Sequence, residues 1–333
     1  MAAQNLCKAC GQPIYGHYIH ALGAVWHPEH FICAACHRPI QSGSYNVKDN
    51  LPYHPACYIQ QFAPRCAYCG KPLAGDYVVT NGASYHPDCY REHVVPRCAY
   101  CNQPLTGEYL VDAWGTKFCS RHKQEYPACV YCGRRIPPAQ QQKGETPVCP
   151  ICRSTAIDTI AQAQPLFARV KQWVGSQGLA FHNLPLHLEL TNSTKIAHYL
   201  GDGDLHALGV TLSTMHTLNG HELRTEVNGI AILRGLPATL FQGVVVHELG
   251  HVWLVVHGIK DLPPWAEEGF CEMLAHRYFM QLNTPESLYY ARNIEQNTSP
   301  VYGEGFRRVQ ALVDRLGFAQ VLETMRATKH LPF

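Results

Sequence analysis

A five-residue run in the C-terminal half of the chain holds the groups of a metal-dependent hydrolase. It reads His247-Glu248-Leu249-Gly250-His251, an HExxH pattern within a strongly apolar segment that predicts a helix. Four residues make about one helical turn, so the two imidazoles point the same way and can share one ion. Glu248 lies beside them, in position to take a proton from a water molecule at that ion. The pattern is typical of zinc peptidases, with two histidine ligands and a glutamate base.

A second metal signature fills the N-terminal half. Fifteen of the sixteen cysteines lie within the first 152 residues, largely in pairs spaced C-x2-C, and five nearby histidines bring the number of ligands to twenty. Two such pairs can surround one tetrahedral ion, so the sequence predicts five structural zinc sites. Each site has 16 or 17 residues between its two pairs, and the five sets are Cys7, Cys10, His27, His30; Cys33, Cys36, His54, Cys57; Cys66, Cys69, His86, Cys89; Cys98, Cys101, Cys119, His122; and Cys129, Cys132, Cys149, Cys152.

Redox or coincidental clustering is the alternative interpretation of these thiols. Five matched spacings use every local cysteine, which favours metal ligation. The N-terminus has no basic start and no apolar core, which predicts no secretory signal and a cytoplasmic protein in which disulfides are rare. The residues between the ligand pairs predict short hairpins around turn glycines, at residues 15–18, 75–79 and 107–111. Modules this small have little core and need the metal to fold.

Net charge bears on the class of partner. Residues 1–153 hold 14 Lys and Arg against 9 Asp and Glu, and the thiolates of five zinc sites cancel that excess. A nucleic-acid surface depends on clustered positive charge, so we expect no nucleic-acid partner. The sequence has no run of about 18 uncharged apolar residues, so we expect no membrane-spanning segment.

The first two zinc modules resemble a LIM domain, a double-zinc protein-interaction module. Only two residues separate His30 from Cys33, and residues 26–31 (WHPEHF) are similar to the middle of a LIM domain, with His30 where cysteine is usual. Longer links separate modules three to five, which we interpret as LIM-like. The resemblance implies that this region binds proteins, either substrates or a regulatory protein. We expect a LIM domain at residues 1–60, LIM-like modules at 61–153 and a further domain at 154–333.

The elements that must position the HExxH run follow from residue periodicity. Alternating or continuous apolar residues predict strands at 184–190, 208–212 and 228–233. Apolar stripes and proline or glycine boundaries predict helices at 154–177 (with Pro165 as a kink), 237–257, 263–282, 303–316 and 318–328. A small sheet followed by helices is an α+β arrangement. The expected fold class is therefore α+β, with an array of small zinc-stapled β modules before an α+β metallopeptidase domain.

The residues after the HExxH run resemble those of the gluzincin peptidases. Residues 265–272 (WAEEGFCE) match the x-E-G-[FIL]-x segment of that class, whose glutamate on a second helix completes a His-His-Glu zinc site. The resemblance implies Glu268 as the third ligand, with Glu267 as the alternative one position earlier. Three protein ligands leave a fourth position for water. Glu272 lies one turn beyond and could accept a hydrogen bond from His247, which would orient that ring.

The order of motifs over nearly the whole chain resembles one family. Zinc modules, residues 230–237, the HExxH run, residues 267–271 and residues 301–307 follow one another as in the LIM-domain zinc metallopeptidases that limit organ size in plants. The resemblance implies a latent gluzincin endopeptidase that cuts a few regulatory proteins. The plant proteins carry ubiquitin-interacting helices before the LIM domain. The first zinc ligand here is Cys7, so we expect a short form without those helices.

These patterns predict a zinc-dependent endopeptidase that acts on protein or peptide substrates and binds one catalytic and five structural Zn²⁺. His276 and Tyr302 are candidates for stabilising the oxyanion, His276 because it lies eight residues past Glu268 on the same helix face, and Tyr302 because it lies in a family-like segment. We expect the strand at Ile230–Leu233 to be a sheet edge that pairs with substrate. The alternatives are an adaptor with a latent or inactive peptidase domain, an aminopeptidase, and a nucleic-acid-binding zinc protein, which the near-neutral zinc half disfavours.

Overall fold

The computed structural model of the chain describes residues 5–41, 43–141, 146–181, 184–201, 205–218 and 221–332. Residues 1–4, which begin the segment expected to hold no secretory signal, lie outside the described residues. The chain divides into two compact units. The first comprises residues 1–110 and 117–119, and the second comprises residues 111–116 and 120–333.

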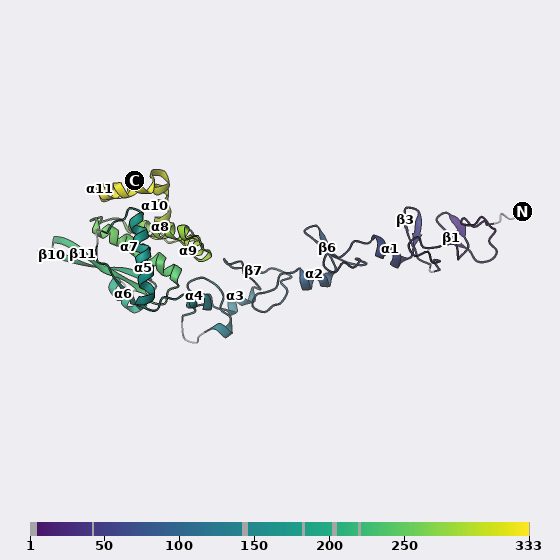
Figure 1. Cartoon of the computed structure of the whole chain (residues 1–333), viewed down its shortest axis with the longest axis horizontal. Coiled ribbons are helices and arrows are strands. Elements are labelled where there is room, and N and C mark those ends of the chain that lie inside the picture. Colours follow the sequence, from purple (N-terminus) through teal and green to yellow (C-terminus); the bar gives the residue numbers. More distant parts are fainter. Residues whose placement is uncertain are drawn as a thin grey trace. The chain divides into compact units, whose positions relative to one another are not determined.

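Each of the first four zinc modules contains a short antiparallel hairpin between its two ligand pairs (Figure 1). The turns carry left-handed glycines at Gly23, Gly82 and Gly115, so the strands lie farther along the chain than the segments expected from the sequence. The hairpins are β1 (Ile19–Ala21) with β2 (Ala24–Trp26), β3 (Asn46–Lys48) with β4 (Leu51–Tyr53), β5 (Val78–Thr80) with β6 (Ala83–Tyr85), and β7 (Leu110–Val111) with β8 (Lys117–Phe118).

Short helices lie at the second ligand pair of modules two to five. In the second and third modules the helix begins directly after a histidine ligand, with proline at its first position. These helices are α1 (Pro55–Phe62), α2 (Pro87–His93), α3 (Arg121–Glu125) and α4 (Pro150–Ser154), with a 3₁₀ turn, η1, at Pro138–Gln140. Modules one and two share one small core around the buried Phe31 and Ile40.

The second unit contains a three-stranded sheet of β9 (His187–Thr191), β10 (Gly209–Leu218) and β11 (His221–Leu233), in the order β10-β11-β9. β11 pairs antiparallel with β10 and parallel with β9. Ile230 therefore has Thr211 on one side and Leu188 on the other. The prediction that Ile230–Leu233 forms a sheet edge is wrong, because its backbone groups are already paired on both sides. The edge strand beside the HExxH helix is β10.

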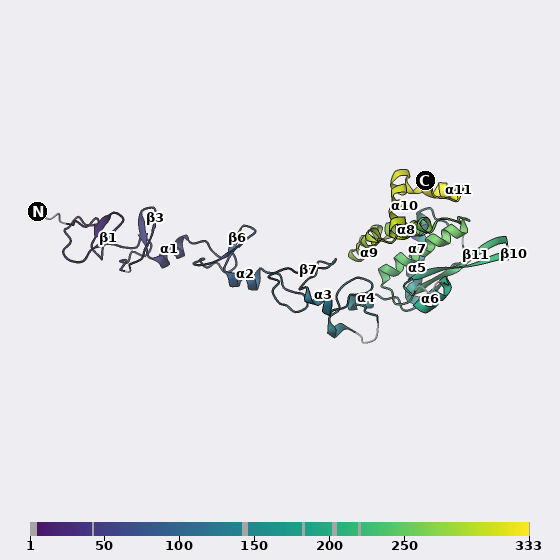
Figure 2. The same ribbon diagram turned by 180° about the vertical axis from the view of Figure 1, so that it is seen from behind.

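Helices cover this sheet on both faces. α6 contacts β10 and β11, and α7, the HExxH helix, contacts the same two strands together with α5, α8 and α9 (Figures 1 and 2). The helices of this unit after α4 are α5 (Ile160–Ser176), α6 (Ser193–Leu200), α7 (Ala238–Val256), α8 (Pro264–Leu282), α9 (Pro285–Gln296), α10 (Gly303–Leu316) and α11 (Phe318–Thr328). The expected α+β class, with small zinc-binding modules before a helix-rich region, is confirmed.

Among the helices that follow α4, the observed bounds match the expected ones within two residues, with three differences. α5 begins at Ile160 instead of Ser154, because the main chain of residues 155–157 pairs with residues 235–238 before the helix starts. α6 and α9 were not expected. Both open with a side-chain cap, Asn192 and Thr284 respectively.

The core of the second unit is built around α7. Phe241, Val245, Leu249 and Trp253 have no exposed surface, and apolar residues from α5, α8 and β11 pack against them. By length and composition alone, α7 is the one helix in the described ranges that could cross a membrane, and 67% of it is buried inside the fold. A helix that is apolar all round is also what the centre of a folded core requires.

Candidate metal centre and its cleft

Three side chains from α7 and α8 bring their donor atoms together in a small triangle. The Nε2 atoms of His247 and His251 lie 3.3 Å apart. Glu268 Oε2 lies 3.1 Å from His247 Nε2 and 3.6 Å from His251 Nε2. Donors bound at about 2.0–2.2 Å to a tetrahedral zinc ion are roughly 3.3 Å from one another, so these side chains have the spacing of a zinc site.

The structure separates the roles of the two neighbouring glutamates on α8. Glu267 Oε1 lies 3.0 Å from Nδ1 of His251, on the side of the ring that points away from the triangle, and nearly half of its side chain is exposed. Glu272 Oε1 lies 3.3 Å from Nδ1 of His247, as the sequence analysis expects. The geometry favours Glu268 over Glu267 as the third ligand. Glu267 and Glu272 are placed to orient the two imidazoles.

The carboxylates make this centre favourable for a cation. Burial acts to lower the pKa of His247, but its hydrogen bonds to Glu268 and Glu272 outweigh burial and raise that pKa well above its ordinary value. The hydrogen bonds from both histidines hold the pKa of Glu268 far below its usual range against the opposing effect of burial. An environment that favours a proton on imidazole also favours a divalent metal ion in the proton's place.

Close packing of glycines sets the distance between the ligand helices. A Cβ on Gly250, in the HExxH turn, would lie 2.8 Å from Cys271 Sγ on α8. Cys271 is fully buried at this contact, and its thiol also interacts with His251. On the other side of α8, Gly269 lies against the main chain of Gly305 on α10. These approaches fix α8, and therefore Glu268, close to α7.

Glu248 is buried, and a side chain of the sheet holds it in place. Its side chain is 6% exposed, and the Thr211 hydroxyl on β10 lies 2.9 Å from its Oε2 and 3.0 Å from its carbonyl oxygen. Gly209, also on β10, leaves room for the carboxylate, because a Cβ there would lie 2.8 Å from Glu248 Oε1. The edge strand thus positions the carboxylate that the sequence analysis assigns as the base.

A cleft of about 1060 Å³ opens over these residues. Its lining includes His247 and Glu248 on α7, Glu272 on α8, Gly209 at the start of β10, and Tyr302. His276 is not part of the lining. It lies on α8 with Nε2 2.8 Å from Glu295 Oε1, and its ring packs against Phe306. Of the two oxyanion candidates, the structure therefore places Tyr302 at the cleft.

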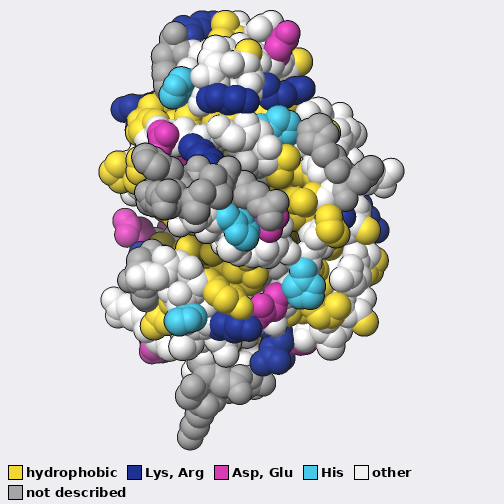
Figure 3. All heavy atoms as spheres, turned by 90° about the vertical axis from the view of Figure 1, so that its left-hand side faces the viewer, with side chains coloured by type: hydrophobic (Ala, Val, Ile, Leu, Met, Phe, Trp, Pro, Cys, Tyr) yellow, Lys and Arg dark blue, Asp and Glu magenta, His cyan; other side chains and the backbone are white. Residues whose placement is uncertain are grey.

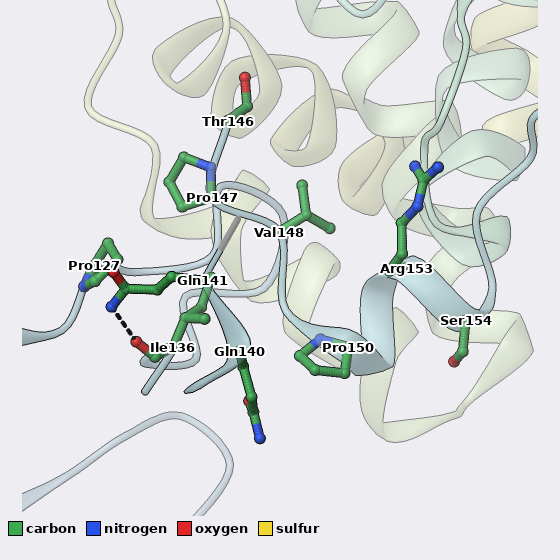
Figure 4. A pocket seen from close by; sticks show the side chains of 10 residues that line it. All are labelled: Pro127, Ile136, Gln140, Gln141, Thr146, Pro147, Val148, Pro150, Arg153 and Ser154. Atoms are coloured by element: carbon green, nitrogen blue, oxygen red, sulfur yellow. Dashed lines mark hydrogen bonds between the residues drawn. The ribbon is translucent and has the colours of Figure 1, made fainter. Parts of the chain in front are cut away.

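A second pocket, of about 590 Å³, lies among residues of the fifth zinc module and α4 (Figure 4). Pro127, Pro147 and Pro150 border it, and Gln141 donates a hydrogen bond to the carbonyl of Ile136 at 2.8 Å. Among the residues that the structure describes, its lining includes Arg153 but no histidine, cysteine or acidic residue. This pocket offers neither metal ligands nor an acid–base pair, so the cleft over α7 is the candidate active site.

Comparison with protein families covers both parts of the chain. The LIM domain model matches residues 7–62 and 66–127. The DA1-like model, described as Protein DA1, matches residues 206–288 and 283–328, which contain the HExxH helix and Glu268. The chain combines LIM domains with a DA1-like region. The family resemblance expected from the sequence is thereby confirmed.

The chain is similar over almost its whole length to several plant proteins. Protein DA1 of Arabidopsis thaliana is 25% identical, over 98% of this chain and 68% of the relative. Protein DA1-related 1 of the same plant is 25% identical, over 99% and 67%. LIM domain-containing protein HDR3 of Oryza sativa subsp. japonica is 24% identical, over 98% and 74%.

The five cysteine and histidine sets, four of them within the LIM matches, are each grouped closely enough to hold a metal ion. In each of the five sets of four predicted ligands, the donor atoms lie within 4.8 Å of one another. The Sγ atoms of Cys98 and Cys119 are 3.9 Å apart, close to the roughly 3.8 Å expected for two thiolates on one zinc ion. Backbone N–H groups support the thiolates, such as that of His54, which lies 3.4 Å from Cys33 Sγ. The clusters are consistent with zinc binding by LIM domains.

The sequence analysis did not identify the residues on other elements that hold Glu248 in place or line the cleft. Thr211 and Gly209 belong to β10, whose sequence shows only a short strand pattern. Their nearness to Glu248 depends on how the sheet docks against α7, which no local motif encodes. The cleft also includes Val130 and Tyr131, from between two cysteines of the fifth zinc module.

Proposed function

We propose that the DA1-like region is a zinc-dependent endopeptidase and that the LIM domains recognise its protein substrates or a regulatory protein. The observation that carries this proposal is the triangle of His247 Nε2, His251 Nε2 and Glu268 Oε2, with sides of 3.1 to 3.6 Å, beside the buried carboxylate of Glu248. LIM domains generally mediate protein–protein interactions, which supports the second part.

His247, His251 and Glu268 would hold the catalytic zinc ion, with Glu272 and Glu267 orienting the two rings. When bound there, zinc supplies Lewis-acid chemistry, since it acidifies water and polarises a carbonyl group. The five cysteine and histidine sets would hold five further ions with structural roles. The proposed complement is six zinc ions in each chain.

Glu248 would serve as general base and then as general acid. It would take the proton of the attacking water and pass it to the leaving amine of the peptide. The Thr211 hydroxyl, 2.9 Å from Glu248 Oε2, would hold the carboxylate in one orientation during this transfer. Because α7 carries Glu248 and Thr211 on β10 holds its carboxylate, the carboxylate needs little reorganisation when substrate binds.

The substrate would lie along the edge of the sheet. In the part of the chain that the structure describes, β10 is paired only with β11, so its other side can bind an extended peptide through main-chain hydrogen bonds. The Tyr302 phenol, which borders the cleft, would donate a hydrogen bond to the oxyanion. The oxyanion role of His276 stays a prediction, since the side chain faces Glu295 outside the cleft lining.

The experiment compares the full chain with Glu248→Gln in a peptide-library cleavage assay. We expect the variant to keep its zinc content and to lose cleavage by at least about 100-fold, the usual contribution of a positioned acid–base group. Glu323→Gln, at an exposed position on α11, is the control and should cleave like the wild type. Persistent cleavage by Glu248→Gln would reject the assigned base.

The same assay separates the alternatives. Cleavage within peptides whose N-termini are acetylated supports an endopeptidase, whereas release of N-terminal residues from unblocked peptides alone indicates an aminopeptidase. A wild-type chain that binds proteins through the LIM domains, contains the sixth zinc ion and cleaves no peptide supports the adaptor.

A further inference from the structure

The fifth zinc module, defined by Cys129, Cys132, Cys149 and Cys152, differs from the other four in its surroundings. All four thiols are buried, and the module belongs to the same compact unit as the DA1-like region. The LIM matches end at residue 127, before its first ligand. This module therefore has the position of a component of the candidate peptidase domain.

The main chain attaches the module directly to the HExxH helix. The module ends with α4, and the three residues that follow run beside the segment that leads into α7. Ile157 N donates to Leu236 O at 2.9 Å, Gly235 N donates to Ile157 O at 2.8 Å, and Ala238 N donates to Thr155 O at 2.9 Å. Ala238 is the first residue of α7. These hydrogen bonds fix α4 relative to the helix that carries the metal ligands.

Side chains attach the module to α9 as well. Trp114 stacks on Tyr289 of α9 with ring centroids 4.9 Å apart, and its Nε1 donates to Cys132 O at 2.8 Å. The Arg134 guanidinium lies 3.5 Å from the centroid of the same indole ring. Gly133 passes so close to Tyr289 that a Cβ there would lie 3.0 Å from the phenol oxygen. The module is thus held at two places, the start of α7 and α9.

These attachments bring the turn between Cys129 and Cys132 to the candidate active site. Val130 and Tyr131 line the same cleft as His247 and Glu248. Tyr131 packs against the core of the DA1-like region, whereas 53% of Val130 is exposed. The cleft also has apolar lining on three helices, from Leu240 on α7, Phe279 on α8, and Tyr290 and Ile294 on α9. An apolar side chain of a bound peptide would find matching surface there.

We propose that the fifth zinc module is a wall of the substrate-binding cleft and that Val130 and Tyr131 form an apolar specificity subsite for a large apolar side chain of the substrate. Tyr131 is the anchored part of this subsite, and Val130 is the part available to substrate. The proposal rests on the proposed peptidase function. It gives a role in substrate selection to a module whose four cysteines would bind a structural zinc ion.

The chain offers a matched pair of positions for the test. Val130 is 53% exposed, and Ile151 on α4 of the same module is 51% exposed but is not part of the cleft lining. Val130→Glu and Ile151→Glu each place one carboxylate on the surface of the fifth module. Both full-length variants should keep the zinc content and thermal stability of the wild type. A difference in cleavage preference between the two variants therefore reports a change in the cleft, and not a change in the folding of the module.

The wild type and both variants are given a randomised peptide library, and the residues around each cleaved bond are identified by mass spectrometry. We expect Val130→Glu to lose preference for large apolar residues at one substrate position, with kcat/KM for such peptides reduced about 10-fold, the range for one apolar contact. At that position it should tolerate lysine and arginine better. Ile151→Glu should keep the wild-type profile. Unchanged preferences in Val130→Glu, or the same change in both variants, would overturn the proposal.

A binding experiment keeps this inference separate from the hydrolase proposal. If the wild type cleaves no peptide, the hydrolase proposal fails, and the same library is used for affinity selection with the immobilised chain. A shift in the selected peptides for Val130→Glu alone would support the subsite without catalysis. Identical selected peptides for the wild type and Val130→Glu, or no selection by the wild type, would overturn it.

Discussion

Gly269 on α8 lies directly against the main chain of Gly305 on α10, one residue after the predicted ligand Glu268. A Cβ on Gly269 would overlap the carbonyl group of Gly305, and a Cβ on Gly305 would overlap the carbonyl oxygen of Trp265. Two glycines facing one another let the helices cross at a separation that no larger residue allows. The glycine that follows the glutamate in the sequence motif therefore has a physical role in placing the metal ligand.

We predict that Gly269→Ala destabilises the second unit and displaces Glu268. Alanine gains up to about 1 kcal/mol in helix propensity, but overlap with main-chain atoms costs about 1–3 kcal/mol or more, so the clash wins. Thermal unfolding followed by tryptophan fluorescence measures this, since four of the five tryptophans lie in that unit. Gly175→Ala in α5 is the control. It has open space around it and should be neutral or stabilising. Equal melting temperatures for the two variants would contradict the account.

We predict that Thr211→Val impairs catalysis without loss of zinc. The substitution removes the hydroxyl that holds Glu248, and a hydrogen bond to a charged group contributes about 1.5–3 kcal/mol, so kcat should fall about 10- to 100-fold. KM should change little, because Thr211 is not proposed to bind substrate. Thr211→Ser keeps the hydroxyl and should restore most of the rate. If the valine and serine variants have the same kcat, the hydroxyl does not position the base.

We predict that Glu272→Ala weakens one zinc site selectively. The side chain contacts the outer nitrogen of His247, and removing such a partner lowers metal affinity by about 10- to 100-fold. Competition with a zinc-binding dye should show one ion leaving at lower dye concentration, with the others unchanged. Glu323→Ala, at an exposed position on α11, serves as the control. Unchanged affinity of every site in Glu272→Ala would remove Glu272 from the metal centre.

Much of the DA1-like fold follows from local sequence signals. α10 and α11 match their predicted bounds, because each has a distinct apolar stripe and Gly317 separates them. α6 escapes such reasoning because its eight residues show few turns of periodicity, and α9, at twelve residues, was not recognised either. The strand expected at Ile230–Leu233 is present within β11, and only its expected place at the edge of the sheet is wrong. An apolar run identifies a buried strand, but its place in the sheet depends on partners that are distant in sequence.

The candidate site also contains some residues that local sequence signals predict and others that they do not. His247, Glu248 and His251 come from one helix, so their spacing alone predicts their geometry. Glu268 required a family resemblance, since a run of two glutamates does not reveal which one faces the histidines. Sheet docking brings Thr211 to Glu248, and the fifth zinc module brings Val130 to the cleft, and no motif near either residue signals this.

The most direct test of the account is an anomalous diffraction experiment at the zinc absorption edge on crystals of the full chain. We predict a peak at about 2.0–2.2 Å from His247 Nε2, His251 Nε2 and Glu268 Oε2, in addition to the peaks of the cysteine and histidine sets. A zinc-replete crystal with no peak between α7 and α8, or with a peak there from which Glu268 points away and which no other acidic side chain ligates, would contradict the proposed catalytic centre.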